Sequence, residues 1–141
     1  MDKFLAELTV FFMNAEHRPM LQIGRRRRKT QHMRILLDRL GISPKYKGYR
    51  MLLIAVEIAV QDEDAMTQIT QKIYPPIAAR CGTTPANVEK NLRKAIEVFW
   101  NYGDRTFYGR LAGYPPTSKP TNAEFIGALA SYILRNLHRQ K

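Results

Sequence analysis

Small, polar and cationic side chains recur at helical spacing between residues 86 and 94. They are Ala86, Asn87, Lys90, Arg93 and Lys94, and Glu97 follows one turn later. The guanidinium of Arg93 can bond to O6 and N7 of guanine, the amide of Asn87 can pair with adenine, and the ammonium of Lys90 can reach guanine or a phosphate. A helix in the major groove of DNA requires such side chains. An ordinary solvated helix face is the alternative.

These side chains need an element that presents them, and the preceding residues have the pattern of a helix-turn-helix. Ala78 is a small residue where two helices can cross closely, and Gly82, four residues later, can adopt the positive φ of a tight turn. Thr84 is a good N-cap residue, and Pro85 suits the first helical position. We therefore predict a recognition helix over residues 85–102.

The predicted recognition helix also has an apolar face. Winding the sequence at 3.6 residues per turn places five apolar side chains on the side opposite the cationic set: Val88, Leu92, Ala95, Ile96 and Phe99. Ile77 and Cys81 lie one turn apart on the shorter helix before it and can face the same core. The second helix is thus predicted to have a buried inner face and a cationic outer face.

The rest of the chain shows helical periodicity and no strand-like alternation. Apolar stripes lie at residues 33–40, ended by Gly41, and at 122–138, after a capping box formed by Thr121 and Glu124. Residues 49–60 are apolar on most faces and are predicted to form a buried central helix. A further helix, which carries Met66, Ile69 and Ile73, is predicted to begin at Asp62-Glu63-Asp64. Residues 109–116 are interpreted as a glycine-rich loop between Tyr108 and Tyr114, which we expect to pack in the loop, the alternative being a phosphate contact. The fold class is therefore all-α.

We expect two parts: an N-terminal amphipathic helix and basic linker over residues 1–29, and a compact bundle of about six helices with the helix-turn-helix over residues 30–141. The first helix presents an apolar face of aromatic and leucine side chains: Phe4, Leu8, Phe11 and Phe12. Such a face is costly to leave in water. We expect it to support self-association, and a partner protein is the alternative occupant.

The chain has 141 residues and a formal net charge of +11, which favours a polyanionic partner. Residues 1–50 carry twelve basic and four acidic side chains, whereas residues 51–71 carry four acidic and no basic ones. A basic run is interpreted as an arm that grips phosphates: Arg25, Arg26, Arg27, Arg28 and Lys29. Such an arm adds affinity without sequence preference. A solvated tail is the alternative.

Several functional classes lack support in the sequence. The single cysteine, Cys81, and three scattered histidines give no metal-ligand spacing, so we expect no metal or cofactor. No nucleophile–base pair or phosphate loop can be assembled, so an enzyme is not expected. The longest apolar run is too short to span a bilayer, and no secretory signal precedes it. We expect a soluble intracellular protein.

From about Met33 to Leu137 the chain also carries ordered motifs of a known family. They are Lys47-Gly48-Tyr49, Tyr74-Pro75 with Ile77-Ala78, Thr83-Thr84, Val88-Glu89, Arg93 with Ala95-Ile96-Glu97-Val98 and Trp100, and Lys119-Pro120-Thr121-Asn122 with Glu124-Phe125-Ile126. With these motifs the chain resembles the C-terminal effector domain of the stage-zero sporulation transcription factor A of spore-forming bacteria. The resemblance implies a six-helix DNA-binding domain that binds short operator boxes near promoters, with domains in tandem. It also implies a bacterial cytoplasmic protein associated with the nucleoid.

The resemblance also implies residue roles and two departures. It assigns base contacts to Glu89 and Arg93, and to Lys90 with less support, because Asn87 and Lys90 stand where the family is expected to have arginines. Lysine keeps the charge but loses the bidentate fork, so the operator sequence is expected to differ. The family's phosphoacceptor receiver domain has no counterpart in residues 1–32, which are too few to form one.

The leading hypothesis is a sequence-specific regulator of transcription that binds double-stranded DNA through the outer face of the recognition helix. The predicted DNA-binding residues are Thr84, Ala86, Asn87, Glu89, Lys90, Arg93 and Lys94. Tandem or dimeric assembly on DNA and RNA polymerase are considered as further partners. The alternative is an interaction protein without a receiver domain, which modulates another regulator or RNA polymerase and binds DNA weakly or without sequence preference.

Overall fold

The computed structural model describes the backbone of residues 22–138 and the side chains of residues 31–136. The described part contains six α-helices: α2 (Gln22–Leu40), α3 (Lys47–Gln61), α4 (Tyr74–Cys81), α5 (Pro85–Tyr102), α6 (Arg105–Ala112) and α7 (Asn122–His138). A 3₁₀-helix, η1 (Glu63–Thr67), and a π-helix, η2 (Ile69–Ile73), connect α3 to α4. Residues 22–138 contain no strand, so the predicted all-α class is confirmed.

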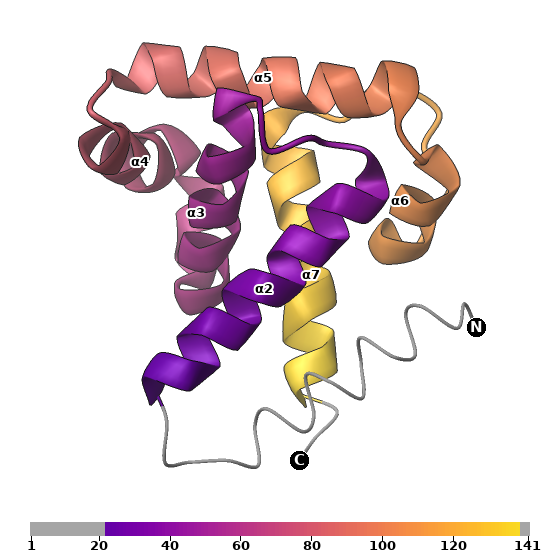
Figure 1. The fold of residues 1–141 in the computed structure, drawn as a ribbon, viewed down its shortest axis with the longest axis horizontal. Helices are drawn as coiled ribbons and strands as arrows, with labels where there is room; N and C mark the ends of the chain where they lie inside the picture. Colours follow the sequence, from indigo (N-terminus) through magenta and orange to yellow (C-terminus); the bar gives the residue numbers. More distant parts are fainter. Residues whose placement is uncertain (1–21, 139–141) are drawn as a thin grey trace.

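Helix α5 lies across one end of the molecule, above the ends of α3 and α7 (Figure 1). Helices α4 and α6 lie near the two ends of α5, and α2 crosses in front of α3 and α7. Helix α3 is the central element: it packs against α2, α4, α5 and α7. The prediction that residues 49–60 form a buried central helix is therefore confirmed.

Helix α2 begins earlier than the sequence analysis expected. Residues 19–29 were interpreted as a linker or arm, but the backbone is helical from Gln22, so the expected division between residues 29 and 30 falls inside α2. Arginine and lysine are good helix formers, and a run of them can extend a helix that packing stabilises further along. At the other end, Gly41 has a φ of 93°, and the Ile42 amide donates to the Leu37 carbonyl at 3.0 Å. This is a Schellman ending, as predicted.

The connection between α3 and α4 also differs from the prediction. A single helix carrying Met66, Ile69 and Ile73 was expected, but the 3₁₀-helix and the π-helix are separated at Gln68. The Asp62 side chain caps the first piece by accepting from the Asp64 amide at 3.1 Å. Pro75 and Pro76 lack the amides that a helix continuing from residue 69 would need, so regular α-helix restarts only at α4.

Helix α6 occupies part of the stretch that was predicted to be a loop. Asp104 caps this helix by accepting from the Phe107 amide at 2.9 Å, and Gly113 ends it with a φ of 91°. Residues 109–112 are therefore helical, and the loop prediction is wrong for them. The glycines at positions 103, 109 and 113 favoured a loop prediction. The helix forms because Asp104 caps it and because Phe107 and Leu111 are buried against the rest of the bundle.

Helices α3 and α5 approach each other at Gly48. A Cβ atom at this position would overlap the carbonyl oxygen of Asn91 and lie 2.7 Å from the Cβ of Ala95. The next residue, Tyr49, donates from its hydroxyl to the Asp38 carboxylate of α2 at 3.1 Å. Burial, followed by the charge of Asp38, raises the pKa of Tyr49 to about 12, which keeps the hydroxyl protonated as a donor. The start of α3 thus packs against α5 and is hydrogen-bonded to α2.

Candidate nucleic-acid interface

Helices α4 and α5 are joined by a tight turn that contains the glycine, the N-cap threonine and the proline expected from the sequence. Gly82 is left-handed, with a φ of 64°, and its amide and that of Thr83 both donate to the Ala78 carbonyl. The Thr84 hydroxyl then accepts from the Asn87 amide at 3.2 Å, and Pro85 is the first residue of α5. The predicted glycine turn, N-cap and helix start are therefore confirmed.

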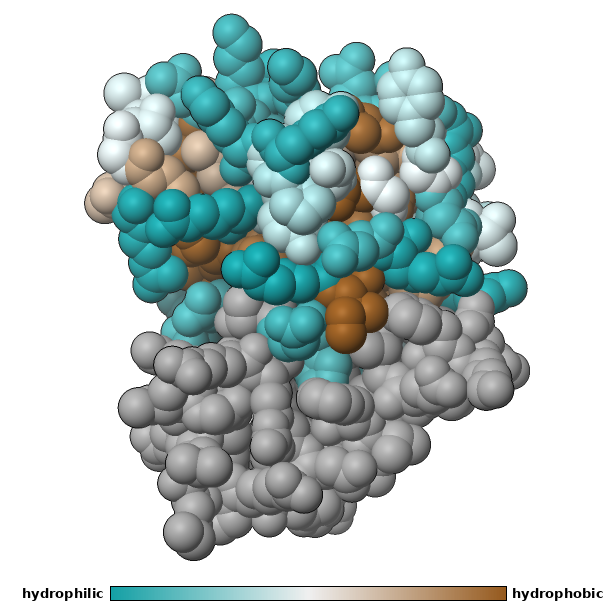
Figure 2. Space-filling model, viewed as in Figure 1, coloured by the Kyte–Doolittle hydropathy of each residue, from teal (hydrophilic) through white to brown (hydrophobic). Residues whose placement is uncertain are grey.

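Helix α5 has two faces of opposite character. The buried residues are the five of the predicted stripe: Val88, Leu92, Ala95, Ile96 and Phe99. The exposed residues include the whole predicted outer set: Ala86, Asn87, Lys90, Arg93 and Lys94. Figure 2 shows hydrophilic to intermediate residues along the edge where α5 lies in Figure 1. The N-terminal half of α5 therefore presents polar and cationic groups to solvent.

Arg93 is already engaged on the helix surface. Its guanidinium pairs with the Glu89 carboxylate one turn earlier, and 55% and 45% of the two side chains remain exposed. The pair orients the arginine fork along the outer face of α5. A base that bonds to Arg93 must share the guanidinium with Glu89 or displace the carboxylate. Glu89 can thus act on DNA directly, by accepting from a base amine, or through Arg93.

Asn87 has a structural partner that the sequence analysis did not anticipate. Its side-chain amide donates to the Thr83 hydroxyl at 3.1 Å, within the turn that precedes α5. The same amide nitrogen carries a second N–H that can donate to adenine, and the Thr83 bond fixes the direction in which it points. Within the described part of the chain the side-chain oxygen of Asn87 accepts no hydrogen bond, so it remains an acceptor toward solvent.

Helix α7 fixes the helix-turn-helix through Asn122, a residue that sequence reasoning assigned only to a helix start. Its amide donates to the Tyr74 hydroxyl of α4 at 3.1 Å and to the Glu89 carbonyl of α5 at 3.2 Å. The predicted capping box beside it is confirmed, since Thr121 and Glu124 exchange hydrogen bonds of 3.1 and 3.3 Å. No local sequence signal could have shown a contact across 33 and 48 residues.

A cleft of about 690 Å³ opens beside the turn, between the first turn of α3 and the start of α5. Its lining includes four cationic side chains, Lys45, Lys47, Arg50 and Lys90, and no acidic one. Of these four, only Lys90 was predicted from the sequence to bind DNA, while Lys47 entered only as part of a family motif. The first turn of α3 reaches α5 because Gly48 permits close contact, and sequence spacing alone could not place Lys47 and Arg50 there.

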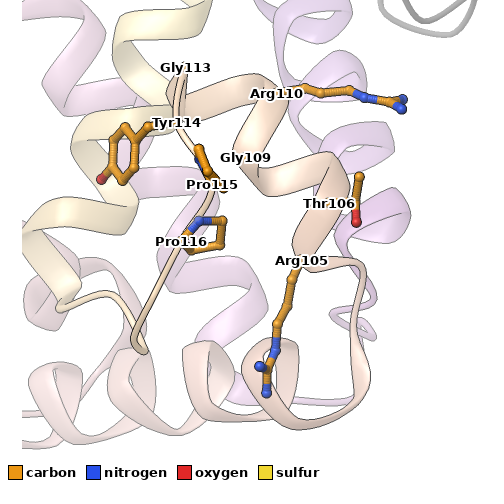
Figure 3. Close-up of a pocket in the computed structure, with 8 residues that line it drawn as sticks. All are labelled: Arg105, Thr106, Gly109, Arg110, Gly113, Tyr114, Pro115 and Pro116. Carbon is orange, nitrogen blue, oxygen red and sulfur yellow. The ribbon is translucent and has the colours of Figure 1, made fainter.

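Another hollow is lined by α6 and the loop that follows it. Figure 3 shows Tyr114, Pro115 and Pro116 of this loop opposite α6. Tyr108 is only 1% exposed, so the alternative of a phosphate contact is wrong for this residue and its expected packing role is confirmed. Arg105 stacks 3.5 Å from the centroid of the Trp100 ring and donates to its carbonyl at 2.7 Å.

Some predicted site residues lie outside the described part of the chain. The self-association face of Phe4, Leu8, Phe11 and Phe12 falls before residue 22 and stays a prediction. For the basic run, Arg25, Arg26, Arg27, Arg28 and Lys29, the structure describes the helical backbone only. Its role as a phosphate-contacting arm also stays a prediction.

Among the described residues, no group of three or more His, Cys, Asp or Glu side chains is arranged to hold a metal ion. No helix within residues 22–138 combines the length and apolar character needed to cross a membrane.

The turn, the two-faced α5 and the supporting bundle define a helix-turn-helix protein. Residues 33–133 match the family model described as "Sporulation initiation factor Spo0A C terminal", and the chain belongs to this family. The resemblance inferred from the motifs is thereby confirmed. This is a family of DNA-binding effector domains of sporulation and not a family of enzymes.

Proposed function

We propose that the protein is a sequence-specific regulator of transcription that places α5 in the major groove of double-stranded DNA. The observation that supports this most strongly is the exposed outer face of α5, because a rigid turn and a buried stripe hold it outward. Within this proposal, Arg93 and Glu89 contact bases as a pair, and Lys90 contacts guanine or phosphate. Thr84, Ala86, Asn87 and Lys94 complete the contact surface.

The decisive experiment is selection of bound duplexes from a random DNA pool, followed by affinity measurements at several salt concentrations. The proposal predicts enrichment of a short sequence and an affinity that falls steeply with salt. If the pool yields no preferred sequence, the proposal fails, and the alternative of an interaction protein that modulates another regulator or RNA polymerase takes its place.

We expect Arg93→Ala to weaken binding to the selected operator by about 1–3 kcal/mol, because a bidentate contact to guanine is lost. The substitution also frees the Glu89 carboxylate to repel DNA, so the double variant Glu89→Gln/Arg93→Ala separates the two effects. Lys72→Ala is the matched control, since this lysine pairs with Asp62 at 3.7 Å and lies outside the interface. Titration of operator and scrambled duplexes measures the change. Equal affinity of Arg93→Ala and wild type for the operator would remove Arg93 from the base-contacting set.

Replacing Arg25, Arg26, Arg27 and Arg28 together with alanine should weaken binding to all DNA about equally. Within the proposal these arginines contact phosphates and carry no base preference. The slope of log K against log salt should flatten by about 0.9 for each of up to four contacts. The measurement is the slope on operator and scrambled duplexes, and an unchanged slope on both would show that the basic run does not touch DNA.

A further inference from the structure

The cleft beside the helix-turn-helix turn is continuous with the outer face of α5. Three segments line the cleft. They are Asn87, Lys90 and Asn91 of α5, Cys81 to Thr83 at the turn, and Pro44 to Lys47 with Arg50 and Met51 at the start of α3. Two residues of the proposed DNA-contacting face, Asn87 and Lys90, therefore belong to both surfaces. A DNA strand that leaves the outer face of α5 toward α3 passes directly over the cleft.

The charge of the cleft is one-sided. Lys45, Lys47 and Arg50 are exposed, and neither they nor Lys90 form an ion pair with any residue of the described part of the chain. Lys47 and Arg50 stand at the N-terminal end of α3, whose first turn has no acidic residue. The helix dipole disfavours cations at this end. Cations that gather there without a carboxylate create a positive potential that an external anion would neutralise.

We propose that this cleft binds the phosphodiester backbone of DNA beside the groove that α5 occupies, with Lys45, Lys47 and Arg50 as phosphate ligands. The inference rests on the proposed function and adds a second contact surface to it. A DNA strand fits better than a free phosphate ion, because the cleft is much larger than one phosphate and shares Asn87 and Lys90 with the outer face of α5. Its role is to set the register and angle of α5, since backbone contacts position a protein on the duplex.

The start of α3 is rigid enough for that role. Gly48 lies in direct contact with α5 at Asn91 and Ala95, and the Tyr49 hydroxyl is bound to Asp38 of α2. The backbone that carries Lys47 and Arg50 is therefore held against α5. A contact through them restrains the tilt of α5 in the groove, which a contact through an untethered chain could not do.

The test compares wild type with the triple variant Lys45→Gln/Lys47→Gln/Arg50→Gln on the operator selected by the wild type. The variant should select the same sequence, and its salt slope should be flatter by about 2 to 3, at about 0.9 per phosphate contact. Ethylation of single phosphates should interfere with wild-type binding at positions beside the contacted bases. The same ethylations should no longer affect binding of the variant.

Lys72→Gln is the matched control, since it removes one positive charge from a lysine outside the cleft and should leave slope and interference unchanged. An unfolding midpoint equal to that of wild type shows that the triple variant is folded, and the single variants Lys47→Gln and Arg50→Gln replace it otherwise. A wild-type slope and interference pattern in the folded variant overturns the cleft proposal. A changed operator sequence also overturns it, because a backbone contact carries no base preference. By contrast, a wild type that selects no sequence overturns the proposed function itself.

Discussion

Replacing Gly48 with alanine should lower the free energy of unfolding by about 3 kcal/mol, at the upper end of ordinary overpacking effects. The added Cβ would overlap the Asn91 carbonyl oxygen and stand 2.7 Å from the Ala95 Cβ, so α3 must shift away from α5. Alanine also favours helix over glycine by up to about 1 kcal/mol. The steric term should outweigh this gain because a backbone atom, not a flexible side chain, blocks the Cβ.

Urea unfolding of Gly48→Ala measures the effect, and Gly127→Ala is the matched control. Gly127 lies within α7, and a Cβ there would meet only the Met66 Cε at an ordinary 3.6 Å. This control should be neutral or gain up to about 1 kcal/mol. A Gly48→Ala protein as stable as the Gly127→Ala protein would show that α3 and α5 do not need the close approach.

Phe99→Ala should destabilise the protein by about 3–5 kcal/mol, as expected for the loss of a buried aromatic side chain. Phe99 is 0% exposed, and its ring centroid lies 5.2 Å from that of Tyr108 and 5.3 Å from that of Phe125. It therefore joins the C-terminal half of α5 to both α6 and α7. A small domain is stable by only about 5–15 kcal/mol, so this variant loses a large share of its stability.

Thermal and urea unfolding report the Phe99→Ala effect, and Tyr102→Ala on the same helix is the comparison. Tyr102 is 85% exposed, so its truncation should change stability by no more than about 0.5 kcal/mol. Similar losses of stability in the two variants would contradict the conclusion that the buried ring of Phe99 joins α5 to α6 and α7.

The helix-turn-helix could be predicted because its signals are local. Gly82, Thr84 and Pro85 each act on the backbone within a few residues, and the stripe from Val88 to Phe99 follows from helical spacing alone. The same holds for the ending of α2 at Gly41. Such features need no knowledge of where distant segments lie.

The parts that sequence reasoning missed depend on contacts between distant segments. Asn122 holds α4 and α5 from the start of α7, and Lys47 and Arg50 lie beside the start of α5 because Gly48 lets α3 touch α5. Helix α6 was missed because glycines in and around it are typical of a loop. The burial of its apolar side chains depends on other helices, which local sequence does not show. Local patterns thus predicted the outer face of α5 and omitted the cationic wall beside it.

The two faces of α5 have a consequence for how the protein can change over generations. Substitutions at Ala86, Lys90 or Lys94 alter exposed side chains that no buried contact requires, and such changes usually shift stability by less than about 0.5 kcal/mol. Substitutions on the inner face, at Leu92 or Phe99, replace fully buried side chains and therefore lower the stability of the fold. If α5 contacts bases as proposed, the preferred operator can therefore change at almost no cost in folding stability, because the bundle does not depend on the side chains of the outer face.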